Sequence, residues 1–199
     1  MTALALPPAA APPRRNVALV GTMFAIAAGT MLLGGLLAAY FGTRQSFQDS
    51  GQEWVDGSII PNVALVVGYA TLLMSSFTAQ WAVAAIKLDD RRQGYVALGL
   101  TLLLGAAFIN ALTFSWSELG MAAGDGGFAD SMYAVTATHV ALVVAAIVLF
   151  LVMAFRVVGG QYGPRNSEFV ASAVAFWHFV VLAGVAIWWC IWFLEGGPG

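Results

Sequence analysis

The chain has 199 residues, of which 60% are hydrophobic and 9% are charged, and its formal net charge is −2. Soluble domains carry roughly 25% charged residues, so this composition excludes an ordinary water-soluble globule. The single cysteine excludes an internal disulfide, and no basic cluster suggests a nucleic-acid partner. The long apolar runs are continuous and lack the alternation of barrel strands, so they predict an all-α integral membrane protein.

Five apolar stretches follow a short N-terminal segment. Residues 1–16 are rich in proline and alanine and are expected to form a disordered cytoplasmic tail. The apolar stretch after Arg14 and Arg15 is longer than the roughly 7–15 residues of a signal-peptide core, so we interpret it as the first span. The predicted spans cover about residues 17–41, 60–86, 95–114, 132–155 and 169–193. Residues 17–195 are therefore predicted to form one five-helix transmembrane domain.

Basic residues favour the cytoplasmic side of a membrane, and here they gather on one side of the predicted spans. Seven of the eight lysines and arginines precede the first span or lie in the connections after the second and fourth: Arg14, Arg15, Lys87, Arg91, Arg92, Arg156 and Arg165. Only Arg44 lies on the opposite side. The asymmetry predicts a cytoplasmic N-terminus and a C-terminus outside.

Two histidines stand within the predicted spans, His139 in the fourth and His178 in the fifth. An intramembrane ionisable residue is costly and suggests a function. One interpretation is that each histidine bonds to a neighbouring helix. The alternative is haem ligation, because at about 1.5 Å per residue the two rings lie roughly 12 Å and 15 Å from opposite faces. In a core about 30 Å thick they would reach similar heights, as in a haem-b-binding membrane anchor or electron-transfer subunit.

Other chemistries find little support in the spans. They hold too few Cys, His, Asp or Glu residues for a metal site with three or four ligands. No Ser/His/Asp group, phosphate loop or pair of carboxylates appears within them. Neither internal repeats nor broken helices in matching positions occur in the sequence, which argues against a small-solute transporter.

Small and polar residues line parts of the first two spans. Several glycines in the first span would allow close approach of another helix, and Ser75, Ser76, Thr78 and Gln80 in the second could bond across helices. Such surfaces suit packing within the bundle, packing against another subunit, or lipid binding in a cleft.

Four stretches together resemble a known family. The second span reads PNVALVVGYATLLMSSFTAQWA, the first ends in GLLAAYFGTR, the last contains WHFVV, and the fourth contains His139-Val140. In this order they resemble subunit III of the haem–copper respiratory oxidases, in the short five-span form of bacteria. The resemblance covers nearly all of the chain after residue 16 and is that of a divergent cytochrome c oxidase subunit 3.

The departures fall on the acids and one histidine of the family pattern. Gly29, Ala171 and Val181 stand where the family usually has a glutamate, a glutamate and an aspartate. Thr136 replaces the first histidine of the fourth-span pair, and Ser115 replaces the glutamate before Trp116. We therefore assign no proton-transfer role to this chain, and the effect of the missing acids on proton uptake stays open.

The resemblance implies an accessory, non-catalytic subunit of a proton-translocating cytochrome c oxidase in aerobic respiration, multi-pass in a bacterial plasma membrane. It implies a main contact with subunit I, a contact with subunit II, and haem and copper in those partners with no cofactor in this chain. Family members bind phospholipid in a cleft between the first two spans and the rest, stabilise subunit I and support proton uptake.

The residues expected to bind lipid or to hold the bundle together within the membrane come from all but the third span. They are Tyr40, Asn62, Ser75, Ser76, Thr78, His139, Trp177 and His178. No residue is expected to be catalytic or to bind metal or cofactor. The specific lipid, the electron donor (cytochrome c or quinol), a relation to nitric oxide reductases and membership of a respiratory supercomplex stay open.

Overall fold

The computed structural model describes residues 17–161 and 167–196, so the predicted tail over residues 1–16 lies outside the described residues. The described chain forms helices throughout and contains no strand, as the sequence predicts. Its elements are α1 (Val17–Asp49), the short 3-10 helix η1 (Gly57–Ile59), α2 (Asn62–Lys87), α3 (Arg91–Leu119), α4 (Gly127–Val158), α5 (Glu168–Ile187), the π-helix η2 (Trp188–Phe193) and α6 (Leu194–Gly196).

Five helices in the described part of the chain are long and apolar enough to span a membrane: α1, α2, α3, α4 and the continuous helix Glu168–Phe193 formed by α5 and η2. Each helix extends beyond the span predicted for it at one or both ends. This extension is expected, because hydropathy marks only the apolar part of a helix and a helix can continue into the interface.

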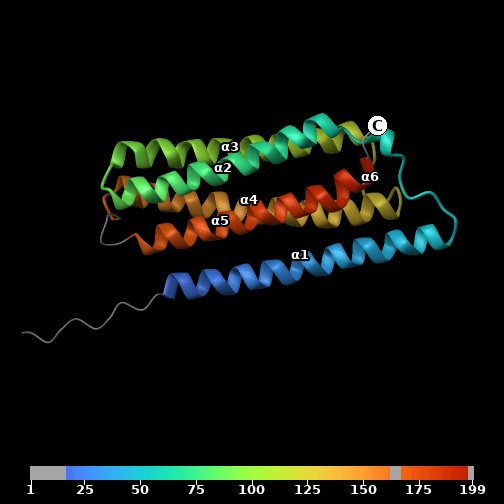
Figure 1. Ribbon diagram of the computed structural model, residues 1–199, viewed down its shortest axis with the longest axis horizontal. Coiled ribbons are helices and arrows are strands. Elements are labelled where there is room, and N and C mark those ends of the chain that lie inside the picture. The colour runs from blue at the N-terminus through green and yellow to red at the C-terminus, as the bar shows by residue number, and fades with distance from the viewer. Residues whose placement is uncertain (1–16, 162–166, 197–199) are drawn as a thin grey trace, which may run out of the picture.

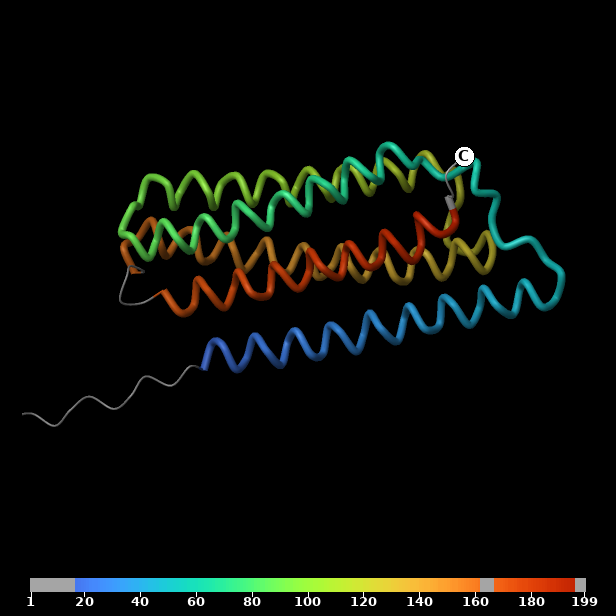
Figure 2. The backbone as a smooth tube through the Cα atoms, viewed as in Figure 1, coloured from blue at the N-terminus to red at the C-terminus, as the bar shows by residue number. Residues whose placement is uncertain are grey.

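The long helices lie side by side with roughly parallel axes (Figure 1). Helix α5 lies between α1 and α2 and also packs on α4, while α2 packs on α3, α3 on α4, and α4 on α1 (Figure 2). The first two spans are therefore on either side of α5 and do not form a layer apart from the other three.

The charged residues distinguish the two ends of the bundle. The end where α1 begins, with the turn between α2 and α3 and the end of α4, is called the basic end; its described cations are Lys87, Arg91, Arg92 and Arg156. The other end, with the α1–α2 and α3–α4 connections and α6, is called the acidic end; its charged residues are Arg44, Asp49, Glu53, Asp56, Glu118, Asp125, Asp130 and Glu195.

A tight turn makes α2 and α3 a helical hairpin. Asp89 in this turn has a φ of 58°, in the left-handed region. The carboxylate of Asp90 then caps α3, because it accepts from the backbone N–H of Gln93 at 3.1 Å and from the side-chain NH₂ group of Gln93 at 2.8 Å. Along the hairpin Gly68 allows close approach, because a Cβ there would lie 3.0 Å from the Cβ of Ala111.

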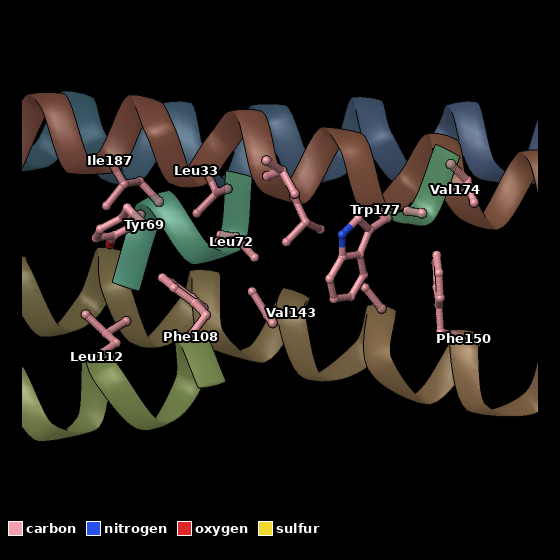
Figure 3. Packing of buried hydrophobic residues seen from close by; sticks show 14 of the residues in the cluster. Leu33, Tyr69, Leu72, Phe108, Leu112, Val143, Phe150, Val174, Trp177 and Ile187 are labelled. Carbon is pink, nitrogen blue, oxygen red and sulfur yellow. The ribbon is translucent and has the colours of Figure 1, made fainter. Parts of the chain in front are cut away.

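The core is built around α5 (Figure 3). Trp177 is fully buried and its ring lies against Phe150 of α4, with centroids 5.0 Å apart. Gly105 of α3 makes room for the indole, since a Cβ there would lie only 2.7 Å from it. Helix α1 is less embedded, with Gly29, Leu33 and Tyr40 as its buried residues.

Candidate functional site

Ser75 and Trp177 join α2 to α5 in the core. The Trp177 indole N–H donates to Ser75 Oγ at 2.9 Å, and both residues are 0% exposed. The Ser75 hydroxyl donates in turn to the backbone carbonyl of Leu72. A buried indole N–H needs an acceptor, and in an apolar bundle a serine on the facing helix provides one. Ser75 and Trp177, both among the residues singled out from the sequence, thus form one contact between α2 and α5.

Ser76, Gln80 and His178 form a second α2–α5 contact closer to the surface. Ser76 Oγ and His178 Nδ1 share a hydrogen bond, and His178 Nε2 lies 3.3 Å from Gln80 Oε1. A carboxamide oxygen only accepts, so Nε2 carries the proton, and in the neutral ring Nδ1 accepts from the Ser76 hydroxyl. Both ring nitrogens of His178 are therefore engaged by α2.

Thr78 connects α2 to α3 at the same level. Its hydroxyl lies 2.8 Å from the hydroxyl of Thr101, which also bonds to the backbone carbonyl of Ala97 at 2.8 Å. The run from Ser75 to Gln80 thus faces α5 and α3 in turn, because successive residues of a helix point about 100° apart. Thr101 was missed by the sequence reasoning, since a lone threonine in an apolar span gives no signal.

His139 holds α4 against α5. It is fully buried, and its Nε2 donates to the backbone carbonyl of Val180 at 2.9 Å. Its ring meets Phe108 edge to face with centroids 5.7 Å apart, while its Nδ1 has no partner among the described residues. Gly184 makes room for the ring, because a Cβ there would lie 2.9 Å from His139 Cε1.

The haem-ligation alternative is not favoured by this geometry. His139 bonds to the backbone of α5, and His178 bonds to side chains of α2, so the two rings do not face a shared space. Similar depth in the membrane is necessary for a shared haem, but the rings must also point toward each other. In the described part of the chain, no group of three or more His, Cys, Asp or Glu residues could hold a metal ion.

Tyr40 belongs to a polar cluster at the acidic end. Its hydroxyl donates to Glu195 Oε1 at 3.0 Å and lies 3.4 Å from the indole nitrogen of Trp54. Arg44 Nε forms an ion pair with the same carboxylate at 2.6 Å. Tyr40 is among the predicted residues, whereas Arg44 stands out in the sequence only within the GLLAAYFGTR stretch and as the cation opposite the other basic residues, and Glu195 has no predicted role. The one signal available was that Arg44 is the single cation at an otherwise acidic end.

Asn62 lies apart from these contacts, in a groove between α2 and α3 near the acidic end. The groove has a volume of about 660 Å³ and is also lined by Asn110, Phe114 and Glu118. A second groove, of about 320 Å³, runs between α1 and α5 and is lined by Leu33, Gly34, Leu37, Phe179, Leu182 and others. A third, of about 190 Å³, lies between α2 and α5.

Uncharged groups occupy the positions where the family pattern usually has an acid or the first histidine of the fourth-span pair. Thr136 and Ser115 are buried, and their hydroxyls donate to backbone carbonyls of their own helices at 2.7 Å and 2.8 Å. Val181 is a buried core residue, and Gly29 receives the Phe179 ring. These positions therefore serve packing here.

Gly184 offers a direct test of the close contact between α5, α4 and α2. We expect Gly184→Val to lower stability by about 1–3 kcal/mol, because the new side chain would overlap His139 from one helix and Leu72 from another. Unfolding of the purified chain in detergent measures this. Gly35→Val on α1 is the control, since a Cβ there meets nothing within 4 Å. Equal stability of the two variants would contradict the packing described.

Comparisons with known proteins agree over most of the chain. A family model described as cytochrome c oxidase subunit III matches residues 14–195. A cytochrome c oxidase subunit 3 of Corynebacterium diphtheriae is 30% identical over 187 residues, which span 92% of this chain and 90% of the relative. A probable cytochrome c oxidase subunit 3 of Nocardia farcinica is 27% identical over 92% of this chain and 90% of its own. A subunit 3 of Thermostichus vulcanus is 28% identical over 81% and 79%.

Proposed function

This chain belongs to the cytochrome c oxidase subunit III family, and from that premise we propose that it braces the catalytic subunit of a haem–copper oxidase without performing chemistry itself. The observation that carries the proposal is the use made of the intramembrane polar groups. Ser75, Trp177 and His178 are engaged in contacts between helices of this chain, and His139 bonds to the backbone of α5. Side chains used in this way stabilise a scaffold.

The proposed setting is a bacterial plasma membrane with the basic end in the cytoplasm. The concentration of Lys and Arg at that end supports this orientation, since basic residues are retained on the cytoplasmic side. The C-terminus would then lie outside. The proposed partners are subunit I, as the main contact, and subunit II, and these would hold the haem and copper.

Phospholipid binding is proposed for the grooves along the bundle. The groove between α1 and α5 is almost wholly apolar and suits an acyl chain. The groove between α2 and α3 combines apolar walls with Asn62, Asn110 and Glu118 near the membrane interface, where polar lipid groups lie. Support for proton uptake would follow indirectly, through stabilisation of subunit I, because the buried positions of the family acids are uncharged here.

Purification from native membranes tests this function. A tagged form of the chain, extracted in mild detergent, is expected to bring with it a complex that shows haem absorbance and contains copper. An oxidase prepared from cells lacking the chain is expected to assemble but to lose activity faster during turnover. Recovery of the chain alone, with no haem-containing companion, would contradict the proposal.

A further inference from the structure

The surface between α2 and α5 combines exposed apolar side chains with one polar group. The α2/α5 face is defined by Leu73, Phe77, Gln80 and Val185, of which Phe77 is 67% and Leu73 40% exposed. Half-buried His178 lies beneath it, bonded to Gln80. Toward the acidic end this face continues into the groove of about 190 Å³ lined by Tyr69, Leu73, Val185 and Trp188 among others.

Gln80 differs from the exposed threonines elsewhere on the bundle. Thr30 and Thr138 lie on the surface of α1 and α4, and their hydroxyls donate to carbonyls of their own helices at 2.8 Å and 2.7 Å. Lipid can cover such groups at little cost, because they are already satisfied. The carboxamide oxygen of Gln80 accepts from His178, but its NH₂ group donates to nothing within the described ranges 17–161 and 167–196.

The position of Gln80 makes lipid a poor cover for that NH₂ group. It lies seven residues before Lys87, the last residue of α2, which at about 1.5 Å per residue is roughly 10 Å along the helix. Acyl chains offer no acceptor at that depth, and leaving an amide donor unpaired in an apolar medium is unfavourable. A facing helix can supply an acceptor there.

We propose that the α2/α5 face docks a transmembrane helix of the catalytic partner subunit, with the Gln80 NH₂ group donating to a carbonyl, hydroxyl or carboxylate oxygen of that helix. The groove between Leu73 and Val185 would receive an apolar side chain from the same helix. The inference rests on the proposed function, since it presupposes a companion subunit. It goes beyond that function by naming the face and the polar contact.

Site-specific photocrosslinking in native membranes identifies what covers this face. The photoreactive residue p-benzoylphenylalanine is placed at Phe77, at Phe24 of α1, which is 73% exposed, or at Leu103 of α3, which is 65% exposed. We expect the probe at position 77 to join this chain to the catalytic subunit, and the other two to give mainly lipid adducts. Lipid adducts alone from position 77, or a product with a second copy of this chain, would overturn the inference.

A substitution tests the hydrogen bond itself. Gln80→Leu is expected to lower retention of this chain in the detergent-solubilised complex by about three- to twentyfold, the range that interhelical hydrogen bonds produce in membranes. Thr138→Val is the control, because its hydroxyl is satisfied within α4. The thermal stability of the isolated chain is measured in parallel: a purely internal role of Gln80 would lower that stability and leave retention equal to the control.

The two proposals fail in different ways. If no haem-containing companion is recovered with the chain, the proposed function is wrong. If a companion is recovered but crosslinks only to the probes at positions 24 or 103, the function stands and the docking inference is wrong.

Discussion

Trp177→Ala is expected to reduce the stability of the isolated chain by about 3–5 kcal/mol, the cost of removing a large aromatic side chain from a core. Trp177 is fully buried, contacts Phe150 and lies against Gly105. The substitution would leave a cavity and deprive Ser75 of its donor. Unfolding in detergent, followed by circular dichroism, measures the loss.

One further variant separates the contribution of the hydrogen bond from that of the packed ring, and a second serves as the control. Trp177→Phe keeps much of the apolar volume but removes the N–H group, so about 1 kcal/mol is expected from the hydrogen bond, with a further loss from the smaller ring. Trp189→Ala is the matched control, because Trp189 is 50% exposed and stacks on Phe193 at the surface. If Trp189→Ala destabilises the chain as much as Trp177→Ala, the core described here is misplaced.

Arg44→Met is expected to lower the stability of the isolated chain by about 2–3 kcal/mol. This loss is smaller than that for breaking a fully buried ion pair, because Arg44 is partly exposed. The side chain of Glu195 is only 7% exposed and that of Arg44 is 30% exposed. Removing the arginine leaves a carboxylate in a largely dry site with Tyr40 as its remaining donor. Loosening of α6 from α1 follows, and hydrogen exchange at residues 188–196 would detect it.

A double substitution tests the coupling of this pair. Arg44→Met combined with Glu195→Met is expected to recover part of the stability lost in Arg44→Met, because no unpaired charge then remains. The pair Arg91–Asp89 is the control, since its side chains are 59% and 62% exposed and such pairs contribute little. Additive losses in the double variant would show that Arg44 and Glu195 do not interact.

The helices were predictable because hydropathy is a local property. Each apolar stretch is continuous and long enough to span a membrane, and the polar connections mark its ends. The neighbours of each helix were not predictable in the same way. The position of α5 between α1 and α2 depends on shape, for example on Gly29 receiving Phe179, and a glycine in a sequence does not identify the ring that it receives.

The sequence indicates which polar side chains lie within the spans, but it does not show which of them contact each other. Ser75 and Ser76 are adjacent in the sequence, as are Trp177 and His178. The contact between Ser75 and Trp177 nevertheless lies in the core, whereas the contact between Ser76 and His178 lies near the surface. This division depends on how α2 and α5 are rotated relative to each other. The partnership of Arg44 with Glu195 joins residues 151 positions apart. For His139 and His178 the sequence predicts a depth in the membrane, but it does not give the direction of each ring.

Native mass spectrometry of the complex purified through this chain tests the central claim most directly. Collisional release is expected to eject this chain as a 20.9 kDa polypeptide, bare or with phospholipid adducts, while the haem remains with the residual complex. A haem or metal adduct on the ejected chain, or a spectrum in which the chain has no companion subunit, would contradict the account.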